Sequence, residues 1–571
     1  MLASKLFATL LAADAVLAIS LQVDSTAAGT PLSDLLHGLM FEDISNSGDG
    51  GLYSQQIRNN AFQGGVTIVD PWNVQYGDAS IEYDSTTPLN DAIHASLKIT
   101  ISDSADGYIG IANPGYRGIV VDGGFYKSSF WIKGEFSGDV KIRLLGTTSD
   151  VEYAFAFIPV TSTSSGWTQY ETDFWTTASP NGDNSYVIEF RGREAAGKTI
   201  NIGYPTLFPP TFKGRENGLT KNIAESLDDL QATFLRFPGG NNLEGFGAST
   251  RWKWNETLGP LEERPGRVGT WGYANTDGLG LMEYLQWCED MNLEPLLAVW
   301  AGLGFGAPIL VGADLEPYVD DALLELEFIL GDVTTAGGAL RASLGHPEPY
   351  HLRFVEVGNE DNLADGCASY PQRFTQFFDA IHSAYSDLTI IASTADENCL
   401  PNPIPEGAWL DFHDYNVPEN YVSQYSLFDD WDRANPILPN LIPFVNKPDG
   451  IVHSVSYHVL KMFSTNKGDV VLPVESEDEM KPVFWSANKK GDDTIIVKIA
   501  NFGPDSQDIK IAIPGKSDAT ASYTVISADP EASNTVDNPK NVQPDSSSIL
   551  GDGDGVFSVK VGQYGVAVLV V

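Results

Sequence analysis

Three patterns of hydrophobic and polar positions follow one another along the chain. Between residues 66 and 208, short alternating segments are separated by Gly, Ser, Asp and Asn, which predicts an antiparallel β-sandwich. From 218 to about 415, apolar segments alternate with amphipathic helical patterns. From about 470 onward, alternating segments return between Gly- and Asp-rich turns, which predicts a second β-sandwich.

The middle region has the strand and helix pattern of a parallel sheet covered by helices. Apolar strands are predicted at 36–41, 233–237, 294–300, 352–357, 388–393 and 409–413. Helices are predicted at 219–230, 279–292, 318–330 and 373–385. Six such strands indicate a (β/α)8-type TIM barrel that is interrupted by the first sandwich.

These patterns divide the chain into four parts. They are a signal peptide (1–20), a barrel domain in two pieces (21–65 and 209–465), an inserted β-sandwich (66–208) and a C-terminal β-sandwich (466–571). Within the signal peptide, Lys5 precedes the apolar run 6–19, and Ala18 and Ser20 are small residues at the cleavage positions. Asp14 departs from this pattern, so a core helix of the mature protein is the alternative. The prediction is a secreted, extracellular protein.

Composition and charge exclude several classes of partner. Among the 571 residues, 34 are Lys or Arg and 76 are Asp or Glu, so the net charge is −42. Nucleic acids and anionic membranes would be repelled, and a neutral substrate is favoured. No stretch after residue 20 reaches the roughly 18 apolar residues that a membrane span needs.

The three cysteines have no metal-ligand spacing. Cys288 lies in an amphipathic helical pattern and is expected to be a buried thiol. Cys367 and Cys399 each follow a predicted strand end, so they are candidates for a disulfide in an oxidising compartment. The sequence leaves the geometry of that pair open.

The strongest chemical signal is an amide followed by a carboxylate at a predicted strand end. Asn359 and Glu360 come directly after the strand at 352–357, and reactive groups in such barrels collect at the carboxyl ends of the strands. Glu360 can protonate a leaving oxygen, and Asn359 can hydrogen-bond a hydroxyl next to the reacting carbon. The alternative is structural, with Glu360 capping the following helix or pairing with an arginine.

Other predicted strand ends carry polar residues in the same way. They are Glu42 after the first strand, Arg236 and Asn241 around the end of the second, and His413 and Tyr415 after the sixth. Taken singly, each has a structural explanation, such as an ion pair for Arg236 or a satisfied core histidine for His413. Several in one barrel indicate an active site, and two carboxylates across a barrel mouth suggest glycoside hydrolysis.

Four of these motifs closely resemble the fungal α-L-arabinofuranosidases of glycoside hydrolase family 51. They are the segments 38–53, 234–242, 252–255 and 355–361, which include Glu42, Arg236, Asn241 and Glu360. The resemblance runs from about residue 21 to 430 and from about 440 to the end. Residues 70–208 resemble the carbohydrate-binding-module-like sandwich that fungal members insert after the first barrel strand.

The resemblance implies a retaining exo-enzyme that releases terminal α-L-arabinofuranosyl groups from arabinan or arabinoxylan without a cofactor or metal. By motif position, it implies that Glu360 is the general acid/base and that Asn359 is its sugar-binding neighbour. It also implies that Glu42, Asn241, His413 and Tyr415 line the arabinose pocket and that Arg236 supports it. The expected partners are arabinose-containing polysaccharides and oligosaccharides, and neither nucleic acid nor membrane is expected.

The nucleophile that the resemblance implies is not found. It would be a Glu in a Gly-Glu-Tyr or Gly-Glu-Phe motif after the seventh strand, and residues 416–453 contain no such motif. About 40 residues separate His413 from the helix at 454–463, which resembles the last barrel helix. A βαβ unit needs about 30 residues, so there is room for one strand at 441–445.

The simplest explanation is a deletion near 436–438. The predicted fold class is therefore multidomain, α/β plus all-β, with an incomplete TIM barrel that lacks the region of strand 7. The carboxylates that could substitute for the nucleophile do not follow an apolar strand; they are Glu419, Asp429, Asp430, Asp432 and Asp449. Two exposed sheet edges also predict poor folding.

Two functions remain open at this stage. The first is a secreted arabinofuranosidase that is active or inactive as the chain stands. The second is a non-catalytic carbohydrate-binding protein or pseudoenzyme, with the inserted sandwich as its binding module. A barrel hydrolase of another sugar specificity has less motif support.

Overall fold

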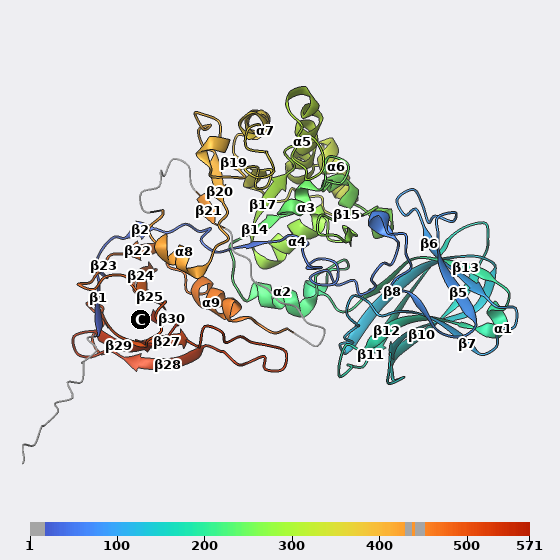
Figure 1. Cartoon of the computed structure of the whole chain (residues 1–571), viewed down its shortest axis with the longest axis horizontal. Helices are drawn as coiled ribbons and strands as arrows, with labels where there is room; N and C mark the ends of the chain where they lie inside the picture. Colours follow the sequence, from blue (N-terminus) through green and yellow to red (C-terminus); the bar gives the residue numbers. More distant parts are fainter. Residues whose placement is uncertain (1–17, 429–436, 440–450) are drawn as a thin grey trace, which may run out of the picture. The chain divides into compact units, whose positions relative to one another are not determined.

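The computed structural model describes residues 18–428, 437–439 and 451–571, which group into two units. One unit contains a parallel sheet with its helices and the inserted sandwich, and the other contains the C-terminal sandwich (Figure 1). The predicted signal peptide lies mostly outside the described residues. Its last residues, Ile19 and Ser20, pair with Ile509 and Lys510 of the C-terminal sandwich.

A seven-stranded parallel sheet forms the barrel domain, in the order β21-β20-β19-β18-β17-β14-β3. The strands are β3 (Gly38–Met40), β14 (Phe234–Phe237), β17 (Glu294–Val299), β18 (Phe354–Val357), β19 (Thr389–Ala392), β20 (Trp409–Phe412) and β21 (Ile437–Pro439). The helices are α2 (Lys221–Asp228), α3 (Asn241–Glu244), α4 (Leu281–Met291), α5 (Glu316–Leu330), α6 (Ala336–Ser343), α7 (Tyr370–Ala384) and α8 (Pro418–Ser423). The six predicted strands and four predicted helices are confirmed, with ends that differ by at most three residues.

Burial on both faces of the sheet explains why the sequences of these strands are continuously apolar. Every residue of β14 and β18 is buried, because helices cover one side of the sheet and barrel side chains fill the other. On the outer side, α5 packs against α6 and α7 (Figure 1). This packing fixes the strand ends at which the predicted site residues lie.

The gap in the barrel differs from the expected one. β21 pairs in parallel with β20, so a strand occupies the seventh place, and the strand predicted at 441–445 lies outside the described residues. Proline has no N–H to donate to a neighbouring strand, so Pro439 is compatible with the position of β21 at the end of the described sheet. In the part of the chain that is described, β21 and β3 are the two ends of the sheet, and β21 stands where the sequence predicts that strand 7 is missing.

The inserted sandwich consists of two five-stranded antiparallel sheets, as predicted. Their orders are β10-β9-β12-β7-β4 and β11-β8-β13-β6-β5. The strands are β4 (Asn73–Tyr76), β5 (Ala79–Asp84), β6 (Ser96–Ile101), β7 (Tyr108–Asn113), β8 (Gly124–Lys133), β9 (Phe136–Gly146), β10 (Glu152–Ser162), β11 (Thr168–Thr176), β12 (Asn184–Arg191) and β13 (Thr199–Phe208), with the short helix α1 (Gly192–Ala195). In β8, every second residue is buried in the core between the sheets.

The C-terminal sandwich takes its strands from both ends of the chain. Its sheets have the orders β23-β1-β26-β29 and β2-β22-β24-β25-β30-β27-β28. The strands are β1 (Ile19–Val23), β2 (Thr30–Pro31), β22 (Val470–Leu472), β23 (Val474–Glu475), β24 (Val483–Lys490), β25 (Thr494–Asn501), β26 (Gln507–Ala512), β27 (Thr520–Ile526), β28 (Asp545–Leu550), β29 (Val556–Val561) and β30 (Val566–Val570). Residues 21–36 are predicted to belong to the barrel, whereas β1 and β2 pair within this sandwich.

The helix predicted at 454–463 is present as α9 (Val455–Ser464). Its buried Met462 packs in a hydrophobic cluster with Ile496 and Val568, which lie in β25 and β30. α9 therefore covers the C-terminal sandwich, although the sequence suggested the last helix of the barrel. The apolar face of α9 has the same period in either place, so periodicity could not tell the two apart.

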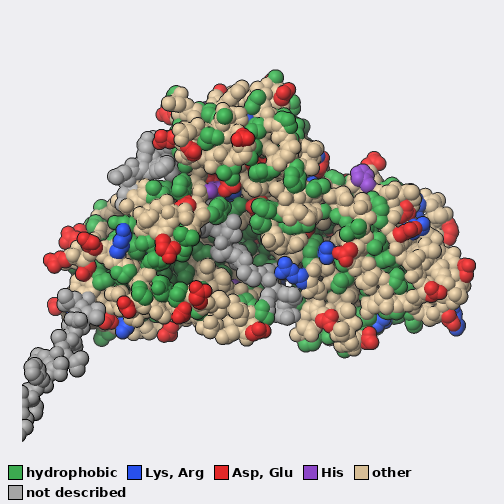
Figure 2. All heavy atoms as spheres, in the orientation of Figure 1, with side chains coloured by type: hydrophobic (Ala, Val, Ile, Leu, Met, Phe, Trp, Pro, Cys, Tyr) green, Lys and Arg blue, Asp and Glu red, His purple; other side chains and the backbone are tan. Residues whose placement is uncertain are grey.

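Three further features bear on the environment of the protein. Cys367 and Cys399 form a disulfide, and Cys288 is a buried free thiol. Among the described residues, every helix is too short or too polar to cross a bilayer. Acidic side chains are spread over the visible face and basic ones are few, in line with the net charge of −42 (Figure 2).

Candidate active site

The predicted site residues lie at the carboxyl ends of the parallel strands. Glu42 follows β3, Arg236 lies in β14, Asn241 begins α3, Asn359 and Glu360 follow β18, and His413 and Tyr415 follow β20. Because the strands run parallel, these ends meet at one edge of the sheet. The contacts below show how the structure brings the seven residues together.

Glu360 belongs to a hydrogen-bonded chain of three residues. His413 Nδ1 lies 2.7 Å from Glu360 Oε1, and His413 Nε2 lies 2.6 Å from Asp411 Oδ2. Burial alone would lower the pKa of His413, but the hydrogen bonds to Asp411 and Glu360 outweigh burial and raise the pKa to about 9. At neutral pH, the imidazolium therefore donates a hydrogen bond to each carboxyl group.

The loop that carries Glu360 has an unusual backbone conformation. Glu360 has a φ of 45° and Gly358 a φ of 90°, which lie in the left-handed region. A Cβ atom on Gly358 would lie 1.8 Å from Asp361 Oδ2, so a side chain does not fit there. Asp361 is buried, accepts a hydrogen bond from the Asn359 N–H at 3.1 Å and pairs with Arg373. These contacts fix the backbone on both sides of Glu360.

Arg236 is buried and orients Asn359. Its guanidinium forms a bidentate pair with Glu356, and Nη2 donates a hydrogen bond to Asn359 Oδ1 at 3.0 Å. Asp411 Oδ2 lies 3.6 Å from Arg236 Nε. Burial raises the pKa of Glu356 to about 7, although Arg236 acts against this rise. Arg236 thereby holds the Asn359 side chain in place beside Glu356 and Asp411.

Glu42 accepts two hydrogen bonds. One comes from Trp271 Nε1 at 2.9 Å and the other from the backbone N–H of Asn242 at 3.1 Å. Burial raises the pKa of Glu42, and the nearby Glu360 contributes to the rise. Trp271 is exposed. Sequence reasoning missed it because it lies in the loop between β15 (Arg267–Val268) and β16 (Ala274–Asn275), where there is no strand or helix periodicity to mark a site.

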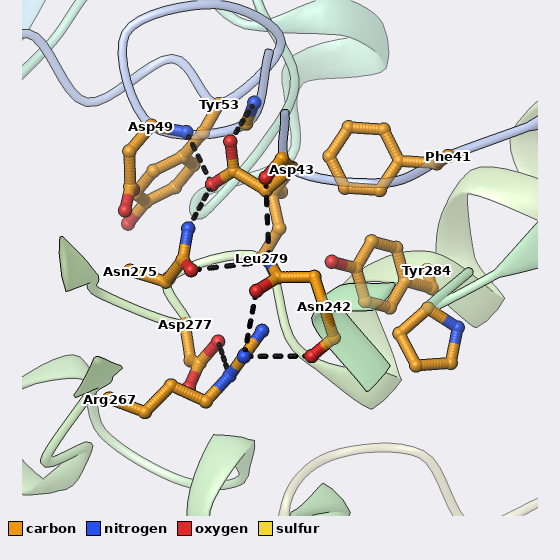
Figure 3. Close-up of a pocket in the computed structure, with 13 residues that line it drawn as sticks. Phe41, Asp43, Asp49, Tyr53, Asn242, Arg267, Asn275, Asp277, Leu279 and Tyr284 are labelled. Atoms are coloured by element: carbon orange, nitrogen blue, oxygen red, sulfur yellow. Dashed lines mark hydrogen bonds and ion pairs between the residues drawn. The ribbon is translucent and has the colours of Figure 1, made fainter. Parts of the chain in front are cut away.

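A buried polar network adjoins Glu42 (Figure 3). Asp43 accepts a hydrogen bond from Asn275 Nδ2 at 2.6 Å, and Asn242 Nδ2 donates to Asn275 Oδ1 at 3.2 Å. Arg267 Nη1 donates to Asn242 Oδ1 at 3.1 Å. Figure 3 shows these side chains pointing toward one another around a small cavity. The network fixes the position of Asn242. It thereby also fixes the backbone N–H of Asn242 that donates a hydrogen bond to Glu42.

Tyr415 is exposed, Asn241 is partly exposed like Glu42, Glu360 and His413, and Arg236 and Asn359 are buried. Tyr415 is 63% exposed, and its ring centroid lies 6.2 Å from that of His413. Asn241 is partly exposed, and its Oδ1 accepts a hydrogen bond from Asn359 Nδ2 at 3.1 Å. Tyr415 and Asn241 are therefore open to the solvent, whereas Asn359 is covered.

The described residues contain no nucleophilic carboxylate at the end of a seventh strand. Among the candidate substitutes, Glu419 is exposed on α8. Asp429, Asp430, Asp432 and Asp449 lie outside the described residues. Within the described part of the chain there is also no group of three or more His, Cys, Asp or Glu residues that could hold a metal ion.

Replacing His413 with glutamine is expected to remove a pH-dependent part of the stability. Because folding raises the pKa of His413 from 6.5 to about 9, its contribution is complete below about pH 6.5 and is lost as the pH rises through about 9. The shift corresponds to about 3 kcal/mol. In urea unfolding followed by circular dichroism, the wild-type advantage over His413→Gln should shrink by this order between pH 6.5 and 9.5.

The matched control for that experiment is His351→Gln, because His351 is an exposed histidine away from the site. Its unfolding curves should follow those of the wild type at each pH. A wild-type advantage over His413→Gln that stays constant across this pH range would contradict the proposed ionisation of His413.

Comparisons with known proteins identify the family of this chain. The family model "Alpha-L-arabinofuranosidase 1 domain" matches residues 226–433, and "Alpha-L-arabinofuranosidase C-terminal domain" matches residues 434–564. Alpha-L-arabinofuranosidase A of Aspergillus niger and probable alpha-L-arabinofuranosidase A of Aspergillus terreus are each 44% identical to this chain over 96% of both chains. An arabinose-bound α-L-arabinofuranosidase, MgGH51, superposes with a TM-score of 0.90 at 32% identity, covering 97% of this chain and 99% of its own. The chain belongs to the α-L-arabinofuranosidases of glycoside hydrolase family 51.

Membership of the α-L-arabinofuranosidases confirms the resemblance, the enzyme class and the fold class that the sequence predicts. The fold is shared more widely, since an arabinofuranosidase from Thermotoga maritima aligns with a TM-score of 0.53 at 18% identity over 64% of this chain. The role of each site residue is inferred from its contacts, distances and burial.

The comparison with the Aspergillus niger enzyme also bears on the missing nucleophile. That alignment spans 607 positions, whereas this chain has 571 residues. The alignment covers 96% of this chain, about 548 residues, so about 59 aligned positions have a residue in the relative and none in this chain. The deletion near 436–438 stays a prediction.

Proposed function

We propose that this chain binds terminal α-L-arabinofuranosyl groups of arabinose-containing saccharides and that Glu360 is the proton donor for their release. The observation that carries the proposal is the position of Glu360 at the end of β18, with His413 2.7 Å from one carboxyl oxygen. Asn359, next to Glu360, is held by Arg236 at 3.0 Å. An oriented amide and a carboxyl group at one strand end suit a sugar hydroxyl and the adjacent glycosidic oxygen.

The proton transfer uses the two oxygens of Glu360 differently. His413 engages Oε1, so Oε2 is the oxygen that gives its proton to the leaving oxygen as the bond from that oxygen to the anomeric carbon breaks. In a retaining reaction, a second carboxylate bonds to the anomeric carbon as the leaving oxygen departs. Water then displaces that carboxylate, adding its hydroxyl to the anomeric carbon and returning a proton to Glu360. His413 and Asp411 hold the carboxyl group in place throughout.

A retaining reaction also needs a second carboxylate about 5–5.5 Å from the first. Glu42 lies in the site, but Trp271 and the Asn242 N–H already bind its Oε1, which suits a role in holding the sugar. The nucleophile of the family belongs to the missing segment. We therefore expect this chain to bind the sugar and to turn over slowly.

The test is the release of nitrophenol from 4-nitrophenyl α-L-arabinofuranoside and from 4-nitrophenyl β-D-xylopyranoside. Slow but measurable release from the arabinofuranoside, with none from the xyloside, supports the proposal. Equal rates with both, or failure of L-arabinose to bind in isothermal titration, would overturn it.

Secretion is part of the proposal. It is supported by the apolar run at 6–19 and by the disulfide between Cys367 and Cys399, since disulfides persist in oxidising compartments. Cleavage after Ser20 would leave Leu21–Val23 of β1, which includes the pairing of Leu21 with Ile511. The check is N-terminal sequencing of protein from the culture medium, which should start near Leu21.

A second candidate function is carbohydrate binding by the inserted sandwich. Trp175 in β11 and Phe125 in β8 are directly paired, 69% and 52% exposed, with ring centroids 6.3 Å apart. Exposed aromatic faces of this kind suit a neutral sugar ring. Isothermal titration of the full chain with arabinoxylan tests it: Trp175→Ala should lower the affinity, and an unchanged affinity would remove this function.

A further inference from the structure

Glu244, the last residue of α3, is a buried carboxyl group beside the active-site amide. Its side chain is 1% exposed. Oε2 accepts a hydrogen bond from Asn359 Nδ2 at 3.3 Å, whereas Oε1 has no hydrogen-bond partner among the described residues. Burying a carboxylate in this way is costly, so the neutral acid is the form that fits such a place.

The charges around Glu244 favour the same form. Burial contributes most to raising the pKa of Glu244, and Asp361, Glu360 and Glu42 add to it, so that the pKa reaches about 10. The hydrogen bond from Asn359 acts in the opposite direction and does not offset them. At neutral pH, Glu244 therefore adds no negative charge to a site that already contains three carboxyl groups.

The hydrogen bonds of Asn359 show what Glu244 does there. Arg236 donates to Asn359 Oδ1, so the amide oxygen is fixed and Nδ2 faces the other way. One Nδ2 hydrogen goes to Asn241 Oδ1 at 3.1 Å and the other to Glu244 Oε2. Asn359 is itself 1% exposed and donates both Nδ2 hydrogens to protein groups, so it acts on a ligand through Asn241, which is partly exposed.

We propose that Glu244 is a positioning residue, a neutral acid that anchors one N–H of Asn359 and so directs the other to Asn241 Oδ1, which fixes the Asn241 amide for a hydroxyl of the bound arabinofuranosyl ring. This inference rests on the proposed function of the site. Glu244 acts through Asn359 and does not itself touch the sugar. A glutamine could do the same, because its amide oxygen accepts the same hydrogen bond without a charge, whereas a methionine of similar length could not.

The test measures L-arabinose binding to the full chain by isothermal titration at pH 7. Glu244→Gln should bind within about twofold of the wild type. Glu244→Met should bind about 3–10-fold more weakly, the size expected from the loss of one hydrogen bond. Thermal unfolding of each variant shows that it is folded at the titration temperature.

The matched control is Glu325→Met. Glu325 is also buried, in α5, with an unpartnered Oε1 and a pKa that burial raises well above its ordinary value, but it has no contact with Asn359. Its loss should change the unfolding temperature and leave arabinose affinity unchanged. A purely structural role for Glu244 predicts the same behaviour for Glu244→Met, and that result would overturn the inference.

Two other outcomes are equally decisive. Weak binding by Glu244→Gln would show that an ionised carboxylate is required, which overturns the neutral-acid role while leaving the site intact. Failure of the wild type to bind arabinose would overturn the proposed function, and the inference with it.

Discussion

Replacement of Glu360 by glutamine is expected to slow the release of arabinose from methyl α-L-arabinofuranoside by about 10²–10⁴-fold, the usual contribution of a general acid. Glutamine keeps the shape of the side chain and can still contact His413, so arabinose affinity should change little. The physical reason for the loss is that an alkoxide leaving group needs the proton that Glu360 Oε2 supplies. The measurement is arabinose release under identical conditions, in the 571-residue chain and in a form with the missing segment restored.

The leaving group separates this role from a structural one. A dinitrophenyl leaving group needs little protonation, so Glu360→Gln should lose much less activity with 2,4-dinitrophenyl α-L-arabinofuranoside than with the methyl glycoside. Glu397→Gln, which changes an exposed carboxylate, should behave as the wild type with both substrates. Equal losses with the two leaving groups would show that Glu360 supports the fold and does not transfer the proton.

Restoring the missing segment is expected to raise turnover by on the order of 10³-fold or more, the scale on which catalytic nucleophiles act. The segment would come from the Aspergillus niger enzyme, whose alignment with this chain has about 59 positions without a counterpart here. It would be inserted between Pro436 and Ile437. Hydrolysis of 4-nitrophenyl α-L-arabinofuranoside is the measurement, and the unfolding temperature should rise because end strands of the sheet gain neighbours.

A control insert distinguishes chemistry from folding. The same segment with the glutamate of its Gly-Glu motif changed to glutamine should raise the unfolding temperature but not the turnover. If the unmodified chain already has the full turnover of the restored form, the nucleophile is present elsewhere and the deletion hypothesis is wrong.

The site residues that come directly after a strand could be predicted from the sequence. Glu42, Asn359, Glu360 and His413 come directly after apolar runs, and parallel strands necessarily end at one edge of a sheet. Trp271 was not predictable in this way, because it reaches Glu42 from a loop. Trp271 and Glu42 are brought together only when the chain folds, and their spacing in the sequence does not indicate this contact.

Residues inside helices were also missed for a physical reason. Glu244 ends a four-residue helix, and as an isolated residue in the sequence it is an ordinary acidic side chain. Only the packing shows that it is buried against Asn359 and surrounded by carboxyl groups. The same holds for α9, whose apolar face fits a barrel or a sandwich equally well until the packing is known.

The amino-acid sequence by itself determined the order of strands and helices, the two sandwiches, the family and the strand-end residues, because period, turn chemistry and motifs are local properties of the chain. The tertiary structure alone decided that β1 joins the C-terminal sandwich, that Asp411 and Glu360 share His413, and that Glu244 is buried beside Asn359. Those facts depend on contacts between residues that are distant in the sequence, and burial and charge at such contacts arise only when the chain has folded.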